Sequence, residues 1–345
     1  MTDKIKFSID GKEYLAEPSE SIWDVAKKNN IDIPHLCYSP EPGYRADGNC
    51  RACMVEIKGE RTLAASCIRK PTEGMEVTVN STRAEKSRSM VFELLVSDQP
   101  SKEQSPDPDS KFWNWSEKMG VSTSRFPSKE KINIDRSHKA MSVNLDACIN
   151  CNLCVRACRE VQVNDVIGMA YRGSTAKVIF DLDDPMGEST CVACGECVQA
   201  CPTGALIESS LVNDQGARVN YADRVVDSLC PFCGVGCQTK VHVKDDKILH
   251  VDGKDGPANE NRLCVKGRFG FDYISHEGRL TKPLIRKVGV PKDANFQLKD
   301  SEISDYFEET SWENALDIAA KGLTKSKEDH GPKSLAGFGS AKCSN

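Results

Sequence analysis

The sequence lacks any long apolar run. Near the N-terminus its longest apolar-rich stretch, MVFELLV at 90–96, is far shorter than the roughly 20 residues that a membrane-spanning helix needs. The opening residues, MTDKIKFSID, contain neither the apolar core of a secretion signal nor a twin arginine. These absences predict a cytoplasmic protein without membrane insertion.

Aromatic residues and excess charge are also scarce. Aromatics make up 6% of the chain, and 46 basic against 51 acidic residues give a net charge of -5. This balance argues against nucleic acid as a partner, because nucleic acid attracts a basic surface. With few aromatic side chains for a core, we expect bound metal to replace part of it, as in small metal domains.

Cysteine, by contrast, is abundant. The chain has 17 cysteines in 345 residues, and they are clustered. An odd number cannot all pair, and without a secretion signal such clusters favour metal binding over disulfides. The length allows two to three domains.

Two cysteine runs, CINCNLCVRAC and CVACGECVQAC, share the spacing C-x2-C-x2-C-x3-C. Bacterial two-cluster ferredoxins have this spacing, and the fourth cysteine of each run there binds the other cluster. Zinc is the alternative, although it usually takes two separated C-x2-C pairs. Pro202 follows the second run and Arg159 the first, so only the second run matches the full motif. The spacing predicts two [4Fe–4S] clusters, one held by Cys148, Cys151, Cys154 and Cys201, the other by Cys158, Cys191, Cys194 and Cys197.

Residues 1–80 predict a small α+β domain. A hairpin turns at Asp10-Gly11, a helix begins after Ser21, a second hairpin turns at Lys58-Gly59, and residues 75–79 form a strand. The domain has four cysteines spaced C-x12-C-x2-C-x13-C, which differs from the plant-type ferredoxin spacing. A zinc site or unrelated buried thiols are the alternatives to a two-iron cluster. We predict a [2Fe–2S] cluster held by Cys37, Cys50, Cys53 and Cys67.

This spacing resembles the N-terminal [2Fe–2S] domain of complex I, iron-only hydrogenases and NAD-linked formate dehydrogenases, which implies a β-grasp fold. Residues 81–138 are predicted to form a helix at 82–96, followed by a linker rich in Ser, Pro and Asp. We expect Phe112, Trp113 and Trp115 to anchor the linker, and the helix to bury the face of Met90, Val91, Leu94 and Leu95. Complex I and many hydrogenases hold a further cluster here with one histidine and three cysteines. Residues 68–147 contain only His138 and no cysteine, so that cluster is missing and complex I is disfavoured.

The two-cluster region, residues 139–210, carries the most specific resemblance. Its stretches RSHKAMSVNLDACINCNLCVRAC and DDPMGESTCVACGECVQACPTGAL are similar to the α (catalytic) subunit of cytoplasmic NAD-linked molybdenum or tungsten formate dehydrogenases. Between the runs, KVIFDL predicts a strand, and a turn follows at 185–187.

Residues 222–280 contain a fourth cysteine set, Cys230, Cys233, Cys237 and Cys264, around a hairpin that turns at Asp245-Asp246. Four cysteines across a hairpin also occur in zinc ribbons, so zinc remains an alternative. The stretch resembles the [4Fe–4S] domain that opens the catalytic subunit of bis-pterin oxidoreductases. That resemblance implies an electron relay at Lys266, in LCVKGRFG, although an exposed surface lysine is the simpler reading.

Residues 281–345 resemble the start of an α/β molybdopterin-binding domain. We expect a helix capped by Ser311 and a strand, SLAGFG, that leads into a small-residue loop. The loop GSAKCSN resembles a cofactor-contacting loop, with Gly339, Ser340 and Cys343 as candidate contacts. The catalytic part continues far beyond this point in the family. We therefore expect a fragment, or a chain that a further domain or subunit completes, with no catalytic residue of its own.

The sequence predicts a multidomain α+β electron-transfer protein with one [2Fe–2S] and three [4Fe–4S] clusters. The resemblance implies a molybdenum or tungsten bis-molybdopterin guanine dinucleotide site in the completed enzyme, formate as substrate, and a flavin- and NAD-binding partner subunit. Electrons would pass from the pterin through the Cys230 set and the paired clusters to the [2Fe–2S] domain. The alternative is a stand-alone iron–sulfur adaptor for a hydrogenase. A hydrogenase catalytic subunit is disfavoured, because only Cys343 follows Cys264.

Overall fold

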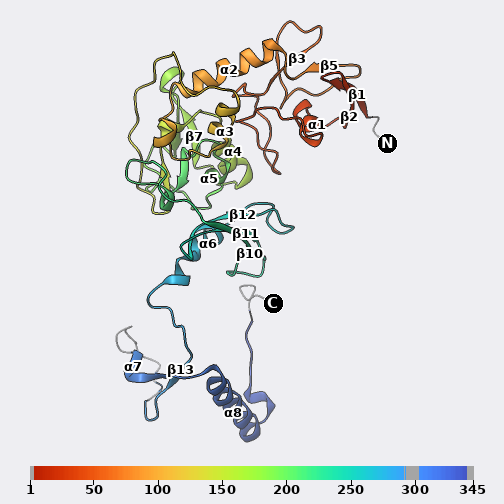
Figure 1. The fold of residues 1–345 in the computed structure, drawn as a ribbon. Helices are drawn as coiled ribbons and strands as arrows, with labels where there is room; N and C mark the ends of the chain where they lie inside the picture. Colours follow the sequence, from red (N-terminus) through yellow and green to blue (C-terminus); the bar gives the residue numbers. More distant parts are fainter. Residues whose placement is uncertain (1–3, 291, 293–302, 340–345) are drawn as a thin grey trace. The chain divides into compact units, whose positions relative to one another are not determined.

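The computed structural model describes residues 4–290, 292 and 303–339 (Figure 1). The chain divides into two units, the first made of residues 1–230 and 237–269, the second of residues 231–236 and 270–345. Each unit is described by itself.

The first unit opens with a five-stranded sheet in the order β2-β1-β5-β3-β4, in which β1 and β5 are parallel. Its strands are β1 (Ile5–Ile9), β2 (Lys12–Ala16), β3 (Met54–Ile57), β4 (Ala64–Ala65) and β5 (Glu76–Thr78). The predicted first hairpin is confirmed, with Asp10 at φ 48° and Gly11 at φ 80°. Positive φ at both central residues is what a tight two-residue hairpin requires. The second predicted hairpin and the strand near residue 77 are also present.

Helix α1 (Ile22–Lys28) packs on this sheet through buried Trp23 and Val25. Ser21 and Asp24 form a full capping box, because the Ser21 side chain accepts from the Asp24 amide and the Asp24 carboxylate accepts from the Ser21 amide. The cap holds the start of the helix beside the chain that leads to Cys37.

Helix α2 (Thr82–Val96) buries a different face from the one predicted. Its buried residues are Ala84, Arg88, Phe92 and Val96, spaced four apart, whereas Leu94 is 49% exposed. Of the predicted apolar face, Met90, Val91 and Leu95 are half-buried, with Leu95 packed against the core around Phe92, and only Leu94 is exposed. Arg88 lies among the buried residues of this helix, which makes that face look less apolar in the sequence. The sequence pattern therefore favoured the neighbouring face.

The segment predicted as a linker contains helix α3 (Lys111–Lys118). One of the serines that suggested a linker is in fact a helix cap, because the Ser110 side chain accepts from the Trp113 backbone amide. Phe112 and Trp113 are buried, and the Phe112 ring stacks on Phe92 of α2 with centroids 6.0 Å apart. The aromatic residues therefore anchor this segment, as predicted, with Trp115 packing at the edge of the same core.

The two-cluster region contains two strand pairs, β6 with β9 and β7 with β8, and the adjacent helices α4 and α5. The elements are β6 (Met141–Val143), α4 (Leu153–Arg156), the π-helical turn η3 (Ala157–Val161), β7 (Ile167–Ala170), β8 (Lys177–Phe180), α5 (Glu196–Ala200) and β9 (Leu206–Glu208). The predicted strand β8 is confirmed, as is the turn closed by the Glu188 amide and the Pro185 carbonyl. Figure 1 shows α5 near the sheet that follows it in the chain.

That sheet has three antiparallel strands, β10 (Arg224–Leu229), β11 (Gln238–Lys244) and β12 (Lys247–Gly253). The predicted turn is confirmed, with Asp245 and Asp246 both at positive φ. The short helix α6 (Val265–Phe269) follows Cys264 and packs on β12.

In the second unit, β13 (Leu284–Arg286) pairs with β14 (Phe307–Glu309), next to α7 (Ile303–Tyr306) and α8 (Trp312–His330). Ser311 caps α8 as predicted, by accepting from the Asn314 amide. The strand predicted at 334–339 is wrong, because Pro332–Ser334 is a 3-10 turn and residues 335–339 form no strand. No strand of the described residues pairs with this segment. Ser340 and Cys343 lie outside the described residues.

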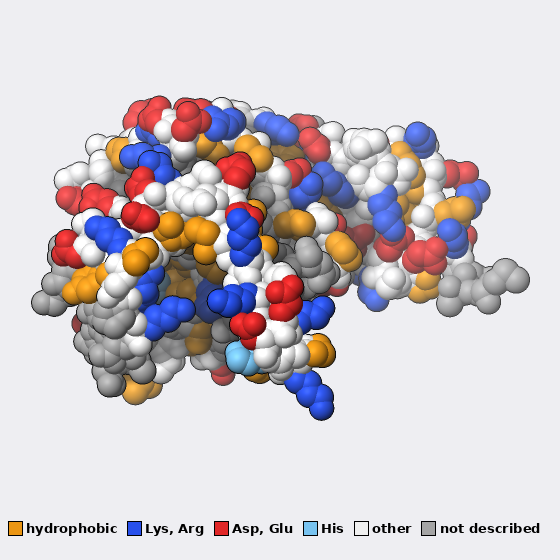
Figure 2. Space-filling model, turned by 90° about the horizontal axis from the view of Figure 1, so that it is seen from below, with side chains coloured by type: hydrophobic (Ala, Val, Ile, Leu, Met, Phe, Trp, Pro, Cys, Tyr) orange, Lys and Arg blue, Asp and Glu red, His pale blue; other side chains and the backbone are white. Residues whose placement is uncertain are grey.

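Within the described residues, none of the helices is both long and apolar enough to cross a bilayer. On the face shown in Figure 2, acidic and basic side chains are interspersed with apolar ones. This mixture agrees with the near balance of 46 basic and 51 acidic residues.

Candidate iron–sulfur sites

The four cysteines of the N-terminal domain lie together. The Cys37 and Cys50 amides each donate to the other residue's Sγ at 3.4 Å, and the Cys53 and Cys67 Sγ atoms are 3.4 Å apart. Contact with Cys50 lowers the pKa of Cys37 to about 2, and contact with Cys37 raises the pKa of both Cys50 and Cys67. Four thiols this close fit a group that binds them all as thiolates.

The first paired set lines one cavity. Cys148, Cys151, Cys154 and Cys201 line this cavity together with apolar side chains such as Leu145 and Leu206. Burial raises the pKa of Cys148 to about 11, and that of Cys154 further. An apolar pocket of four cysteines, in which burial disfavours the ionised form of Cys148, Cys151 and Cys154, fits a metal cluster that supplies compensating positive charge.

The second paired set lies in the same core, with Cys158 and Cys197 buried and Cys191 and Cys194 half-buried. Burial, followed by the charges of Cys194, Cys191 and Cys158, raises the pKa of Cys197. The structure thus brings Cys201 to the first run and Cys158 to the second. This is the crossed arrangement expected from the spacing.

Backbone amides point at several of these sulfurs. The Val166 amide donates to Cys158 Sγ at 3.3 Å, and the Ala193 amide donates to Cys191 Sγ at 3.3 Å. Hydrogen bonds to the sulfurs of an iron–sulfur cluster are one of the factors that determine its reduction potential.

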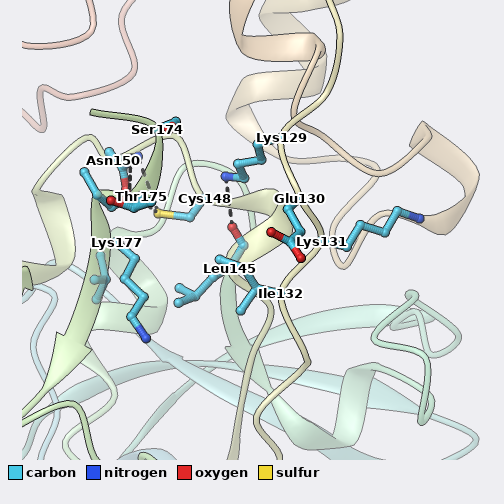
Figure 3. A pocket seen from close by; sticks show the side chains of 12 residues that line it. Lys129, Glu130, Lys131, Ile132, Leu145, Cys148, Asn150, Ser174, Thr175 and Lys177 are labelled. Carbon is cyan, nitrogen blue, oxygen red and sulfur yellow. Dashed lines mark hydrogen bonds between the residues drawn. The ribbon is translucent and has the colours of Figure 1, made fainter. Parts of the chain in front are cut away.

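A cavity of about 450 Å³ lies beside Cys148 (Figure 3). Lys129 and Lys177 point along its walls, and the Asn150 amide donates to Cys148 Sγ at 3.4 Å. The opening leaves this cluster position less enclosed than the Cys154 side, with positive charge nearby. Positive charge stabilises the reduced, more negative state of a cluster, so it should raise the potential there.

Three cysteines of the fourth set belong to the first unit. The Cys230 amide donates to the Cys237 carbonyl at 2.9 Å, and a Cβ added to Gly267 of α6 would lie 3.5 Å from Cys230 Sγ. Helix α6, which begins after Cys264, therefore packs against Cys230. Cys233 lies in segment 231–236, which is counted with the second unit.

The residues expected at the pterin side are exposed. Lys266 lies on α6 with its side chain in solvent, and Gly339 is exposed in the second unit. Among the described residues, nothing contacts either one in a way that assigns it a role.

A buried arginine connects the N-terminal domain to the first paired set. Arg156 is 1% exposed and donates to the Cys37 carbonyl at 2.6 Å and to the Cys151 carbonyl at 3.3 Å. Its Nε lies 3.2 Å from the Asp47 carboxylate, which balances the charge. One side chain thus ties together the ligand loops of two different sites.

A second buried arginine connects the second paired set to the fourth set. Arg268 is fully buried on α6, one helical turn after Cys264, and donates to the Cys194 carbonyl at 3.0 Å. It also donates to Asp252 at 3.2 Å and to the Gln199 amide oxygen at 2.7 Å.

Gly195 makes room for this arginine. A Cβ at Gly195 would lie 2.0 Å from Arg268 Cδ, and the residue has φ +72°, which favours glycine. The position directly after Cys194 therefore admits only glycine without displacement of Arg268.

Neither arginine was predicted from the sequence as a functional residue. Lys266 was the residue predicted in LCVKGRFG, whereas Arg268 is the buried cation of that motif. The positions of the two arginines relative to the cysteines could have indicated their role. Arg268 follows Cys264 by four residues and so lies on the same helix face, and Arg156 lies between two ligand cysteines.

A buried carboxyl near Arg268 gives a testable pH dependence. Burial, and then the nearby Asp252 charge, raise the pKa of Glu208 to about 7 from 4.5. The folded state therefore keeps a proton that the unfolded state releases, so the contribution of Glu208 to stability is full below pH 4.5 and is lost as pH rises through 7.

Glu208→Gln should remove about 3 kcal/mol of this pH dependence, since one pKa unit is worth about 1.4 kcal/mol. The temperature at which the clusters are lost, measured at pH 5.5 and 8, should differ less for the variant than for the native chain. Glu188→Gln, at an exposed position, is the matched control. An unchanged pH dependence in Glu208→Gln would show that this carboxyl ionises normally.

Three family models match the chain. They are a 2Fe-2S iron-sulfur cluster binding domain at residues 2–82, a 4Fe-4S dicluster domain at 147–205 and a molybdopterin oxidoreductase Fe4S4 domain at 223–276. Their order along the chain is the order predicted from the cysteine sets.

Curated relatives match the whole chain. An oxidoreductase of Bacillus subtilis (strain 168), provisionally named YjgC, is 29% identical over 385 residues. A protein of Staphylococcus aureus (strain USA300), provisionally named a formate dehydrogenase, is 29% identical over 390 residues. The match covers 100% of this chain and 37% of each relative, so the chain spans about a third of their length.

A solved structure is also similar. One chain of an NAD+-reducing [NiFe]-hydrogenase in the H2-reduced state matches with a TM-score of 0.54 and 26% identity, over 62% of this chain and 92% of that chain. The chain therefore contains a 2Fe-2S domain, a 4Fe-4S dicluster domain and a molybdopterin oxidoreductase Fe4S4 domain, an arrangement that fits the N-terminal iron–sulfur part of a formate dehydrogenase-like subunit.

Proposed function

We propose that this chain conducts electrons from a molybdenum or tungsten bis-pterin site, where formate is oxidised to CO2, to a flavin- and NAD-binding partner subunit in the cytoplasm. The observation that carries the proposal is the gathering of twelve cysteines into three compact sets linked by a buried arginine, with a fourth set continuing beyond a second arginine. The similarity to proteins provisionally named formate dehydrogenases supports formate as the substrate.

The cysteine sets named above would hold one [2Fe–2S] and three [4Fe–4S] clusters, which supply one-electron carriers when bound. The chain's own residues position these sets. Arg156 holds the Cys37 and Cys151 loops together, and Arg268 holds the Cys194 loop against α6. The order of contacts is therefore the Cys230 set, the Cys191 set, the Cys148 set and the Cys37 set.

The domain limits proposed from the sequence are 1–80, 81–138, 139–210, 222–280 and 281–345. The sheet order β2-β1-β5-β3-β4, with parallel β1 and β5 and a helix packed on it, supports a β-grasp fold for the first domain. We assign the last segment to the start of the pterin-binding domain, with Lys266 as relay and Gly339, Ser340 and Cys343 as cofactor contacts.

Metal analysis of the anaerobically purified chain tests the proposal. The ligand sets predict about 14 iron atoms per chain. Little iron with several zinc atoms would contradict an electron-transfer role, because zinc does not change oxidation state. About one molybdenum or tungsten would indicate that further sequence or a partner completes the active site. Without either metal we expect no formate-dependent dye reduction.

A second candidate function has one observation in its favour. The hydrogenase chain is matched over 92% of its own length, which supports an iron–sulfur adaptor that serves a hydrogenase. The match to the molybdopterin oxidoreductase Fe4S4 domain at 223–276 favours the formate dehydrogenase reading. Electron transfer to purified chain from a formate dehydrogenase catalytic domain, compared with transfer from a hydrogenase, separates the two.

A further inference from the structure

Two histidines face each other on the hairpin of β11 and β12. Neither belongs to the cysteine sets proposed to bind iron–sulfur clusters. His242 and His250 are directly opposite in the antiparallel register. Asp252 follows His250 by two residues on the same strand, so its side chain projects from the same face. All three residues belong to the first unit.

Their polar atoms converge. The imidazole rings are stacked with centroids 3.9 Å apart and planes 16° apart. His242 Nε2 lies 3.1 Å from Asp252 Oδ2, and His250 Nε2 lies 3.7 Å from the same oxygen. One ligand atom from each of the three residues lies within 4.8 Å of the others.

The hydrogen bonding of this cluster is incomplete. His250 Nδ1 is buried and makes no hydrogen bond, and His250 is only 7% exposed. A buried polar group without a partner costs about 1–3 kcal/mol, so native proteins rarely leave one. Burial also lowers the pKa of His250 to about 4, which keeps its imidazole neutral at pH 7. A neutral imidazole is the form that binds metal.

Asp252 is already oriented from its other side. Its Oδ1 accepts from Arg268 Nη1 at 3.2 Å, while Oδ2 faces the two histidines. Metal-binding carboxylates are themselves held by such outer hydrogen bonds.

We propose that His242, His250 and Asp252 bind a divalent transition-metal ion in a site separate from the iron–sulfur clusters. Two imidazoles and one carboxylate are a donor set that zinc, ferrous iron and cobalt accept, with further positions open to water. The nitrogen and oxygen donors distinguish this site from the cysteine sets. The bound ion would sit beside Asp252, whose partner Arg268 contacts the Cys194 loop.

Zinc is the probe for the test. The anaerobically purified, iron-loaded full chain is dialysed against one equivalent of Zn2+, and bound zinc, iron and the zinc K-edge absorption fine structure are measured. We expect one retained zinc per chain, with imidazole scattering, first-shell distances of about 2.0–2.1 Å and no sulfur shell near about 2.3 Å. Iron should remain at about 14 atoms per chain.

His242→Gln/His250→Gln should weaken zinc binding by more than the roughly 10–100-fold that loss of an outer-shell partner costs. His330→Gln, at the exposed end of α8, removes a histidine elsewhere and should retain the zinc. Absence of retained zinc in the native chain, a sulfur-dominated shell, or equal retention by the double variant would each overturn the proposal. If the double variant loses iron and so fails to fold, the native chain's fine structure decides: scattering from two imidazoles at one zinc supports the proposal, because among the described residues only this group places two histidines close enough to share one ion.

Discussion

Arg268→Met is expected to destabilise the first unit by about 3–5 kcal/mol and to remove about four iron atoms per chain. Methionine fills similar volume but leaves Asp252, the Gln199 amide oxygen and the Cys194 carbonyl without their donor. Loss of one partner from a buried ion pair is costly, because the remaining charge stays away from water. Iron content and the temperature of cluster loss measure the effect.

Two controls make this prediction specific. Lys266→Met changes an exposed residue of the same helix and should leave iron content and thermal stability unchanged. Gly195→Ala should reproduce the arginine defect, since its Cβ would lie 2.0 Å from Arg268 Cδ. Gly173→Ala has the same left-handed strain, about 1–2 kcal/mol, but nothing within 4 Å of the new Cβ. Equal iron content in Gly195→Ala and Gly173→Ala would show that Arg268 does not depend on the absence of a side chain at position 195.

Arg156→Met should produce a loss of similar size, about 3–5 kcal/mol, at the junction of the N-terminal domain and the first paired set. The change removes the donor to the Cys37 and Cys151 carbonyls and leaves Asp47 paired only with the more exposed Arg45. Because both ligand loops depend on this residue, up to about six iron atoms should be lost. Electron paramagnetic resonance of the reduced chain should show the [2Fe–2S] signal weakened or broadened.

Arg159→Met is the matched control for this change. Arg159 lies three residues further on, its side chain is 54% exposed, and its partner Asp165 is also at the surface. An exposed ion pair contributes about 0–1 kcal/mol, so iron content should stay at the native value. An intact [2Fe–2S] signal in Arg156→Met would mean that the two loops are held by their own domains.

The sequence predicted local structure well where a single short signal decides it. Asp10-Gly11 and Asp245-Asp246 each mark a tight turn, because few residues accept positive φ at a two-residue hairpin. Ser21 and Ser311 cap helices through contacts three residues away. The strand predicted at 334–339 failed, since a strand needs a neighbour and the sequence pattern cannot supply one.

The spacing of the cysteines also determined the grouping of the sites. A run of C-x2-C-x2-C-x3-C places three thiols in one turn and the fourth beyond it, whichever protein contains it. The structure accordingly brings Cys201 to the cavity of Cys148, Cys151 and Cys154. Short-range geometry was sufficient here because all but one thiol lie within seven residues of one another.

Only the tertiary structure decided which charged residues are buried. In the sequence, Arg156 and Arg159 look alike, as do Lys266 and Arg268, yet one of each pair is enclosed and the other is in solvent. The partners that permit burial, such as Asp47 for Arg156 and Asp252 for Arg268, are 16 to 109 residues away in the chain. A buried charge is tolerable only with its partner in place. Local pattern therefore determined how the cysteines of this protein are grouped, and long-range packing determined how the groups are joined.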